Sequence, residues 1–318
     1  MARPLRIEYP GAFYHVTSRG NDRRAVFRDD GDREKFIALL GQGVDQFQLR
    51  LHVYVLMDNH YHLLVETVLG QLSRAIRYLN GVYTQSFNRR HSRVGHLFQG
   101  RYKAILIEKE SYLLELSRYI HLNPWRVLRS QDPFGYAWSS LKAYAGLSSV
   151  PGWLTVKEVL ASFGGGGKRA YRDFVREGME SGVKTPWDEV RGQALLGSEG
   201  FVSGVVDRYL REVEEKGVEV SGIRELGRFM EADKVLREVS RYYGVNKEDL
   251  RRRSQVFTEP RYVASYFLRR MCLLSLIEIG EKVGLHYSAV SNAIRHVEKS
   301  PTRPLMKSLR EIEQKINN

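Results

Sequence analysis

Two histidines separated by one residue, His60 and His62, have the spacing needed to bind one metal ion together. Side chains at positions i and i+2 of a β-strand point to the same face, so the two imidazoles can converge. Apolar runs of strand-forming residues flank the pair, and Asp58-Asn59 just before it is typical of a turn. The segment therefore predicts a β-hairpin with the histidines at the start of its second strand. An isolated pair of this kind is nevertheless more often two ordinary histidines than two ligands.

A second group of reactive side chains lies in SYLLELSRYIHLNPWRV, residues 111–127. Its leucines recur at helical spacing, which predicts an amphipathic helix. Tyr119 and Asn123 are four residues apart and would share one face of that helix. A tyrosine hydroxyl can attack a phosphodiester, an amide oxygen can bind a hard divalent cation, and Arg118 and Arg126 can hold phosphates. The alternative is a core aromatic at Tyr119 and a helix C-cap at Asn123.

The elements that must position these residues follow one another in the order βαββαβα. Alternation and helical periodicity predict a strand at 12–19, a helix at 30–47, a hairpin at 50–66, a helix at 71–88, a strand at 102–108 and a helix at 110–122. This order matches a split βαβ arrangement and predicts a ferredoxin-like α+β domain with a central antiparallel sheet. The order of the strands within the sheet cannot be read from the sequence.

Four sequence motifs in the first part of the chain occur in a characteristic order. They are PGAFYHVTSRGNDRRAVF at 10–27, MDNHYHLLV at 57–65, GHLFQGRYKAILIE at 95–108 and RYIHLNPWR at 118–126. Together they resemble the single-tyrosine HUH transposases of the insertion-sequence-200-like group, and the resemblance looks closest to the REP-associated tyrosine transposases. The HUH motif, histidine–hydrophobic–histidine, corresponds to His60-Tyr61-His62, in which the aromatic middle residue fits the hydrophobic class only loosely.

The resemblance implies a metal-dependent enzyme that cleaves and rejoins single-stranded or hairpin DNA. In such transposases the histidine strand lies in the centre of the sheet and the tyrosine helix packs beside it. By this resemblance His60, His62 and Asn123 would hold one Mg²⁺ or Mn²⁺, and Tyr119 would attack the DNA to form a 5′-phosphotyrosine. The third ligand in the family is often glutamine, so the shorter Asn123 departs from the pattern.

Basic, amide and aromatic residues beside two of the expected strands are candidates for DNA contacts. The first set ends or follows the strand at 12–19 and consists of Arg19, Asn21, Arg23 and Arg24. The second set lies at or before the start of the strand at 102–108 and consists of Gln99, Arg101, Tyr102 and Lys103. Such a mixture suits backbone contact and base stacking, whereas solvated loop residues are the alternative. His15, on the first strand, is predicted to be a core histidine rather than a ligand.

Positive charge is concentrated at the two ends of the chain. The formal net charge of the 318 residues is +13, which indicates a polyanionic partner. Residues 1–150 hold 21 basic and 13 acidic residues, residues 151–229 hold 12 and 13, and residues 230–318 hold 17 and 11. We therefore expect two DNA-contacting surfaces. The expected regions are a catalytic domain at 1–146, a helical linker or support region at 147–229 and a DNA-binding domain at 230–318.

Several classes of protein and site are excluded by composition. Cys272 is the only cysteine, so neither a disulfide within one chain nor a cysteine zinc site can form. There is no secretory signal and no apolar run as long as a membrane-spanning helix, so we expect a cytoplasmic protein without a membrane partner. The glycine-rich FGGGGKR at 163–169 lacks the spacing of a phosphate-binding loop and is expected to be a flexible connection or turn.

The stretch SLIEIGEKVGLHYSAVSNAIRHVEK, residues 275–299, has the pattern of a helix-turn-helix. The second helix would suit the major groove of DNA. Its exposed side is expected to present Tyr287, Ser288, Ser291, Asn292 and Arg295. The stretch resembles the DNA-binding domain of the bacterial replication initiator DnaA, which implies an all-α C-terminal domain that makes a second DNA contact. A plain helical hairpin is the alternative.

Three other functions are compatible with these motifs. A DNA-binding regulator that has lost catalysis would keep the histidines only as remnants, and the intact His60, His62 and Tyr119 argue against it. A replication or mobilisation nickase of the same superfamily usually shows a different motif order or two tyrosines. A metal phosphodiesterase would form no covalent intermediate. The sequence leaves the choice between monomer and homodimer open.

Overall fold

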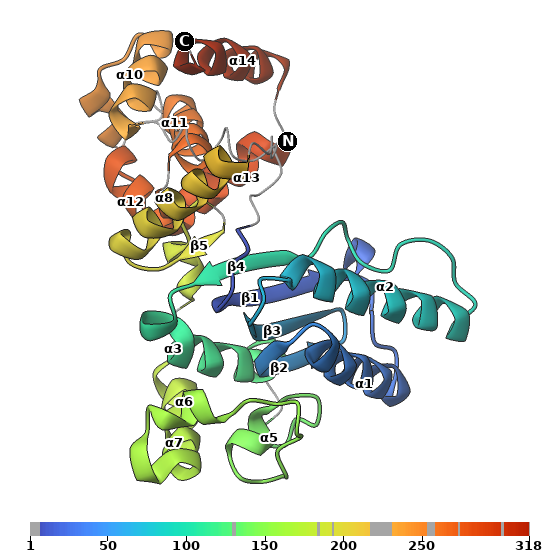
Figure 1. The fold of residues 1–318 in the computed structure, drawn as a ribbon. Coiled ribbons are helices and arrows are strands. Elements are labelled where there is room, and N and C mark those ends of the chain that lie inside the picture. Colours follow the sequence, from blue (N-terminus) through green and yellow to red (C-terminus); the bar gives the residue numbers. More distant parts are fainter. Residues whose placement is uncertain are drawn as a thin grey trace. The chain divides into compact units, whose positions relative to one another are not determined.

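The chain forms two compact units in the computed structural model, and each is described by itself (Figure 1). The residues described are 7–128, 132–182, 185–192, 194–216, 231–252, 258–272, 274–299 and 302–317. The first unit comprises Ile7–Thr185, and the second begins at Pro186. The expected linker or support region at 147–229 is therefore divided between the two units.

Four antiparallel strands form the sheet of the first unit. They are β1 (Ala12–Arg19), β2 (Leu49–Met57), β3 (His60–Thr67) and β4 (Lys103–Ile107). Within this unit their order is β2-β3-β1-β4, so the histidine strand β3 lies between two neighbours. The predicted α+β fold with a central antiparallel sheet is confirmed, and the predicted hairpin is β2 and β3.

One face of the sheet is covered by two long helices, α1 (Asp30–Gln46) and α2 (Leu72–Arg90) (Figure 1). The Phe36 ring of α1 lies 4.9 Å from the Tyr61 ring of β3, centroid to centroid. The Tyr61 hydroxyl also donates a hydrogen bond to Asn80 of α2 at 2.8 Å. Because side chains alternate along a strand, the residues on either side of Tyr61 must face the opposite side of the sheet. His60 and His62 are those residues.

The histidine face of the sheet is the side on which α3 (Lys109–His121) packs. This helix contacts β2 and β3. Its first residue, Lys109, places Nζ 5.0 Å from the centre of the Phe13 ring. Phe13 lies opposite Glu66 of β3, and residues directly opposite in an antiparallel pair share a face. Glu66 is four positions after His62 on the same strand, so the two side chains face the same side of the sheet. The tyrosine helix, which contacts Phe13 on that face, therefore lies on the same side of the sheet as the histidines.

The tyrosine helix ends at His121, two residues before Asn123, and a second short helix, α4 (Asn123–Leu128), begins at Asn123. Leu122 is the C-cap of α3. Pro124 explains the break, because proline lacks an N–H and is tolerated only in the first turn of a helix. Asn123 is therefore the first residue of α4 and not the C-cap of the preceding helix.

Three further helices complete the first unit: α5 (Leu141–Tyr144), α6 (Lys157–Ala161) and α7 (Gly167–Ser181). The glycine-rich segment forms a short 3-10 helix, Gly164–Gly166, that leads directly into α7. Both α6 and α7 contact α3. The segment that follows the predicted catalytic domain is thus part of the packing around the tyrosine helix.

The second unit is almost entirely helical (Figure 1). Its elements are the 3-10 helix Pro186–Glu189, β5 (Leu195–Leu196), α8 (Glu199–Lys216), α10 (Ala232–Tyr243), the 3-10 helix Lys247–Arg251, α11 (Thr258–Met271), α12 (Leu276–Val283), α13 (Tyr287–Lys299) and α14 (Arg303–Asn317). Helices α10 to α14 enclose one apolar core, in which Phe267 and Val290 are fully buried. The sequence did not predict α14, whose Ile312 and Ile316 close this core. No helix in these described ranges is long and apolar enough to span a bilayer.

The turn between α12 and α13 is that of a helix-turn-helix. Ser275 caps α12 and forms a reciprocal capping box with Glu278. Gly284 follows the helix with a φ of +64°, a conformation that favours glycine. At Gly280 a Cβ would lie 2.3 Å from the carbonyl oxygen of Leu285, so only glycine allows this close return of the chain. The predicted helix-turn-helix pattern is confirmed.

Candidate active site

Four polar residues of β1 and β3 meet on the histidine face of the sheet. In the β1–β3 register, His60 lies opposite Arg19 and His62 lies opposite Thr17. Directly opposite residues have neighbouring side chains on one face. Both histidines are buried, with 7% and 9% of their surface exposed, whereas Arg19 is exposed at the end of its strand. The site is thus a pair of buried imidazoles at the edge of a solvent-facing cationic segment.

The buried environment favours the neutral form of both histidines. Burial, followed by the positive charge of Arg19, lowers the pKa of His60 to about 4. Burial, followed by the neighbouring His15 and His60, holds the pKa of His62 well below its usual value. A neutral imidazole is the form that binds a metal ion. Neither histidine needs to lose a proton at neutral pH before it can act as a ligand.

The orientation of His60 is fixed by Asn59, a residue that sequence reasoning treated only as part of a turn. His60 Nδ1 lies 2.7 Å from Asn59 Oδ1, and Asn59 Nδ2 donates to the carbonyl oxygen of Arg23 at 3.0 Å. That second bond identifies Oδ1 as the acceptor, so Nδ1 of His60 must be the protonated nitrogen. The lone pair of His60 is consequently on Nε2. Asn59 stands directly before the first histidine in the sequence, and this position is the signal that could have identified it as a partner of His60.

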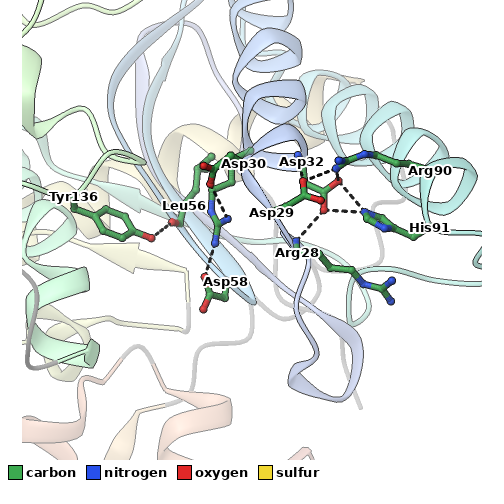
Figure 2. Close-up of polar contacts among 10 residues, drawn as sticks. Arg28, Asp29, Asp30, Asp32, Leu56, Asp58, Arg90, His91 and Tyr136 are labelled. Carbon is green, nitrogen blue, oxygen red and sulfur yellow. Dashed lines mark hydrogen bonds and ion pairs between the residues drawn. The ribbon is translucent and has the colours of Figure 1, made fainter.

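The turn that precedes the histidines is held from several directions. The Asp58 carbonyl accepts hydrogen bonds from the backbone N–H groups of Val26 and Phe27, at 2.8 and 3.0 Å. Its carboxylate pairs with Arg33 of α1 at 2.5 Å. Nearby, the Tyr136 hydroxyl donates to the Leu56 carbonyl at 2.6 Å (Figure 2). The turn is therefore tied to α1 and to the segment after β1, and the end of β2 that leads into it is tied to Tyr136.

Tyr119 lies on α3 close to a positive charge. The Arg126 guanidinium carbon of α4 is 4.5 Å from the centre of the Tyr119 ring. The same charge helps to lower the pKa of His62, so Arg126 is near the histidines as well. Tyr119 is 8% exposed, and its helix packs on β3. Arg126 thus connects the two groups of residues that the sequence singled out separately.

Arg118 is directed away from this site, contrary to the hypothesis that it holds a phosphate. Its guanidinium pairs with Glu115 at 2.6 Å and stacks on the Phe174 ring of α7 at 4.0 Å. It also donates to the Phe174 carbonyl at 3.3 Å. Helical spacing explains the difference, since neighbouring residues of a helix point in different directions. Arg118 docks α7 onto the tyrosine helix.

Asn123 has a buried amide that fits a ligand role. Only 5% of the residue is exposed, and its Nδ2 has no hydrogen-bond partner among the described residues. The oxygen and nitrogen of an amide are nearly interchangeable in shape, so the oxygen can occupy this position by rotation. A buried polar atom without a partner usually indicates an absent water, ion or ligand. Two neutral imidazoles and an amide oxygen are a donor set suited to Mn²⁺ and acceptable to Mg²⁺.

The first two predicted DNA-contacting segments lie side by side near His60. The Gln99 N–H donates to the Arg19 carbonyl at 2.8 Å, and the Asn21 N–H donates to the Leu97 carbonyl at 2.9 Å. Arg19, Arg23, Arg24 and Gln99 are exposed, and Asn21 is half-buried. The Gly20 N–H donates to the Asn59 carbonyl at 2.8 Å. The two predicted DNA-contacting segments therefore lie beside the turn that precedes His60.

Residues 101–103 extend this surface along the start of β4. Arg101 and Lys103 are exposed. Lys103 lies opposite Thr17 of β1, which lies in turn opposite His62, so all three share one face. Tyr102 is half-buried, and its hydroxyl is 3.0 Å from the Ser73 hydroxyl of α2. Tyr102 therefore contacts the helix scaffold as well as bordering the surface.

A chain of buried hydrogen bonds connects the tyrosine helix to α7. His121 lies 2.7 Å from the Tyr171 hydroxyl through Nδ1 and 2.8 Å from the Ser140 hydroxyl through Nε2. The Tyr171 hydroxyl donates to Ser117 of α3 at 2.9 Å. Burial lowers the pKa of His121 to about 3, so it is neutral. His121 belongs to this chain of buried hydrogen bonds.

We expect Tyr171→Phe to destabilise the first unit by about 1–3 kcal/mol. The change would leave the buried His121 Nδ1 without its partner and remove the hydrogen bond that the Ser117 oxygen accepts, while Ser117 would keep its own donation to the Leu114 carbonyl at 2.6 Å. Hydrogen exchange of the α3 backbone amides in the full-length chain would measure the loss. Tyr78→Phe is the control, because its hydroxyl makes only a 3.5 Å contact with Gln42. Equal protection of α3 in both variants would contradict this role of Tyr171.

A second cluster with metal-ligand chemistry, Asp29, Asp32 and His91, is already paired with an arginine (Figure 2). Arg90 pairs with Asp29 at 2.5 Å and with Asp32 at 2.6 Å. The Arg90 hydrogen bond lowers the pKa of Asp29. His91 Nε2 lies 2.9 Å from the carboxylate of Asp32, which also accepts from the Arg28 N–H. The cluster joins the N-terminus of α1 to the C-terminus of α2.

The recognition-helix residues of the second unit lie mostly on the exposed side of α13, as predicted. Tyr287, Ser288, Asn292 and Arg295 are exposed, and Ser291 is half-buried. The opposite side is buried in the core through Val290, Ala293 and Val297. Arg295 donates to the Asn292 side chain at 3.1 Å. An exposed polar stripe opposite a fully buried apolar stripe is the arrangement expected of a helix that reads DNA.

Two parts of the chain match models of known protein families. Residues 9–123 match the family described as "Transposase IS200 like". Residues 232–297 match the family described as "Bacterial dnaA protein helix-turn-helix". The first match ends at Asn123 and contains the sheet and α3, and the second contains α10 to α12 and most of α13.

Individual relatives are similar to only part of the chain. Chromosomal replication initiator protein DnaA 1 of Chlamydia pneumoniae is 40% identical over 68 residues, which is 21% of this chain and 15% of that protein. The DnaA of Bartonella quintana (strain Toulouse) is 29% identical over 119 residues, 33% of this chain and 24% of its own length. A solved structure of a REP-associated tyrosine transposase bound to a REP hairpin has a TM-score of 0.40 and 13% identity, covering 49% of this chain and 92% of that chain.

Proposed function

We propose that this chain, which carries an IS200-like transposase domain at residues 9–123 and a DnaA-type helix-turn-helix domain at residues 232–297, cleaves and rejoins single-stranded DNA. The observation that supports this most directly is the arrangement around Arg126. Its guanidinium lies over the Tyr119 ring, and its charge acts on His62. A candidate nucleophile and two neutral imidazoles thus lie within the family-matched residues 9–123, and Arg126, three residues beyond that match, supplies a cation for the phosphate.

The proposed reaction is a transesterification at a phosphodiester. Tyr119 Oη bonds to phosphorus as the bond from phosphorus to the 3′ oxygen breaks, which yields a 5′-phosphotyrosine and a free 3′-hydroxyl. The proton lost by the tyrosine is balanced by the one gained by the 3′ oxygen. Because the phosphodiester energy is kept in the new bond, a later 3′-hydroxyl can reverse the step and rejoin strands without ATP.

A divalent cation, Mg²⁺ or Mn²⁺, would be held by His60, His62 and Asn123. When bound, such a cation polarises a non-bridging phosphate oxygen and neutralises developing charge. The neutral state of the histidines, the lone pair of His60 on Nε2 and the buried Asn123 Nδ2, which has no hydrogen-bond partner among the described residues, all suit this role. Arg126 would hold the phosphate while Tyr119 attacks.

The substrate strand would reach Tyr119 across the exposed residues at the ends of β1 and β4. The residues proposed to contact it are Arg19, Asn21, Arg23, Arg24, Gln99, Arg101, Tyr102 and Lys103. Basic side chains there suit the backbone, and a partly exposed aromatic suits an unpaired base. Palindromic or REP-like hairpins, whose ends are single-stranded, are the proposed natural substrates.

Trapping a covalent adduct tests this function. The full-length chain is incubated with Mn²⁺ and a labelled single-stranded oligonucleotide that contains a palindromic hairpin, and denatured protein is examined for attached DNA. We expect a denaturation-resistant adduct whose modified peptide contains Tyr119 by mass spectrometry. Cleavage without any adduct would indicate a metal phosphodiesterase instead. DNA binding without cleavage across a panel of hairpins would indicate a non-catalytic regulator.

For the second domain we expect Arg295→Ala to weaken binding of duplex DNA by about 1–3 kcal/mol and to relax sequence preference. Arg295 is exposed on α13 and can reach a base edge from the major groove. Fluorescence anisotropy with duplexes selected by the unmodified protein would measure the change. Arg310→Ala, an exposed arginine on α14, is the matched control. If both changes weakened DNA binding equally, the loss would reflect the removed positive charge and not a base contact made by Arg295.

A further inference from the structure

We propose that His15 is a positioning residue that accepts the Nδ1 proton of His62 and so directs the His62 Nε2 lone pair toward a divalent cation. No part of the sequence pattern placed His15 in the site. The inference rests on the proposed function in one respect, the presence of a cation at His60 and His62. The hydrogen bond itself and its direction can be measured independently of that cation.

The geometry between the two rings is that of a ring-to-ring hydrogen bond. His15 Nε2 lies 2.8 Å from His62 Nδ1. The ring planes are only 20° apart with centroids 5.0 Å apart, so the two nitrogens approach nearly in plane, where the N–H and the lone pair both lie. Both side chains are buried, His15 with 3% and His62 with 9% exposed. Water is therefore not available to replace this bond.

The strand register explains why these two rings meet. Thr17 lies directly opposite His62, and His15 lies two residues before Thr17 on β1, on the same face of the sheet. Diagonal neighbours of this kind lie within reach of ring side chains. The predicted role of His15 as a core histidine is therefore correct in its burial and incomplete in its contacts.

Only one of the two tautomer arrangements leaves His62 able to bind a cation. A neutral imidazole has one N–H, and a single proton lies between His15 and His62. If His15 donates, His62 must carry its own proton on Nε2, and that nitrogen has no lone pair for a metal. If His62 donates, its Nε2 lone pair is available. The ring nitrogen of His62 that remains for a ligand role is the one not facing His15.

Asn59 shows the same arrangement at the other histidine. Its amide oxygen accepts from His60 Nδ1 at 2.7 Å and leaves the His60 lone pair on Nε2. If His15 is the acceptor, His60 and His62 are both protonated on Nδ1, and each has its Nε2 lone pair free to bind a cation. Partners of this kind fix ring orientation and tautomer in metal sites. His15 would thus perform for His62 the role that Asn59 performs for His60.

The first test measures Mn²⁺ affinity of the full-length protein by electron paramagnetic resonance. We expect His15→Phe to weaken Mn²⁺ binding roughly 10–100-fold. His15→Gln, whose side-chain oxygen can accept the same proton, should restore most of the affinity. His52→Phe is the comparison variant, because His52 is a fully buried histidine of the same sheet that stacks on Phe13 and belongs to a different ligand-type cluster, with Glu66 and Glu158. Loss of Mn²⁺ binding in His52→Phe but not in His15→Phe would place the cation in that cluster and overturn the proposal. Unchanged Mn²⁺ affinity in a folded His15→Phe variant would overturn the proposal.

The second test reads the tautomers directly by proton–nitrogen NMR of the imidazoles in the full-length protein. We expect His62 to be protonated on Nδ1 and His15 to be unprotonated on Nε2, with and without the diamagnetic cation Mg²⁺. Protonation of His62 on Nε2 in both states would overturn the proposal. If the unmodified protein binds no Mn²⁺, the proposed metal function fails, while the tautomer measurement still decides the direction of the His15–His62 bond.

Discussion

Cleavage of single-stranded DNA is expected to fall on the order of 10⁴-fold or more when Tyr119 is replaced by phenylalanine. The substitution removes only the hydroxyl that forms the bond to phosphorus. The ring that faces Arg126 is kept, and so is the packing of a residue that is 8% exposed. We therefore expect unchanged folding and unchanged affinity for the uncleaved oligonucleotide. The measurement is a single-turnover cleavage assay with Mn²⁺, followed by denaturing electrophoresis for the adduct.

Tyr112→Phe is the appropriate control for this experiment. Tyr112 lies on the same helix, α3, but outside the group formed by Tyr119 and Arg126. Cleavage and adduct formation should be close to those of the unmodified chain. If Tyr119→Phe continued to cleave at an undiminished rate, Tyr119 could not be the nucleophile, and the proposed reaction would be wrong.

Replacement of His60 or His62 by alanine is expected to have the second largest effect. A bound cation supplies several kcal/mol of charge stabilisation in reactions of this kind, which corresponds to a loss of about 10³-fold in the cleavage rate. Mn²⁺ affinity should fall in parallel. DNA binding should persist, because the exposed arginines of the first unit, such as Arg19 and Arg23, remain. Single-turnover rates over a range of Mn²⁺ concentrations would measure both losses.

One of two other clusters of ligand-type residues among the described residues, Asp29–Asp32–His91, supplies the control for these variants. His91→Gln changes a histidine that contacts Asp32, in a cluster whose two carboxylates already pair with Arg90. We expect no change in Mn²⁺ affinity or cleavage. The reverse outcome, with Mn²⁺ binding lost in His91→Gln and retained in His60→Ala, would move the cation to the Asp29–Asp32–His91 cluster and contradict the proposed ligands.

Local patterns were sufficient to predict most of the elements. The alternation of AFYHVTSR corresponds to β1 (Ala12–Arg19), and the apolar runs on either side of Asp58-Asn59 correspond to β2 and β3. The periodicity before Pro124 corresponds to α3, which ends at His121. These features depend on residues within a few positions of one another, where alternation and helical spacing are direct consequences of backbone geometry.

The sequence was less informative wherever two distant segments meet. Arg118 was a candidate for phosphate contact, but Phe174 and Glu115 hold it at α7. Residues 147–185 were expected to link or support the domains, yet they belong to the first compact unit, where Tyr171 bonds to Ser117 of the tyrosine helix. Helical periodicity indicates that a face is buried, but it does not identify the element that buries it.

By itself the sequence indicated the resemblance of two segments to known families, the order of the elements and the residue types that could do chemistry, including His60, His62 and Tyr119. Only the tertiary structure decided which partners these residues contact. Asn59 orients His60, and His15 bonds to His62. Arg126 lies over the ring of Tyr119. The physical reason is strand register and helix docking. Which side chains become diagonal neighbours across a sheet, or meet beneath a helix, depends on pairings between residues far apart in the chain.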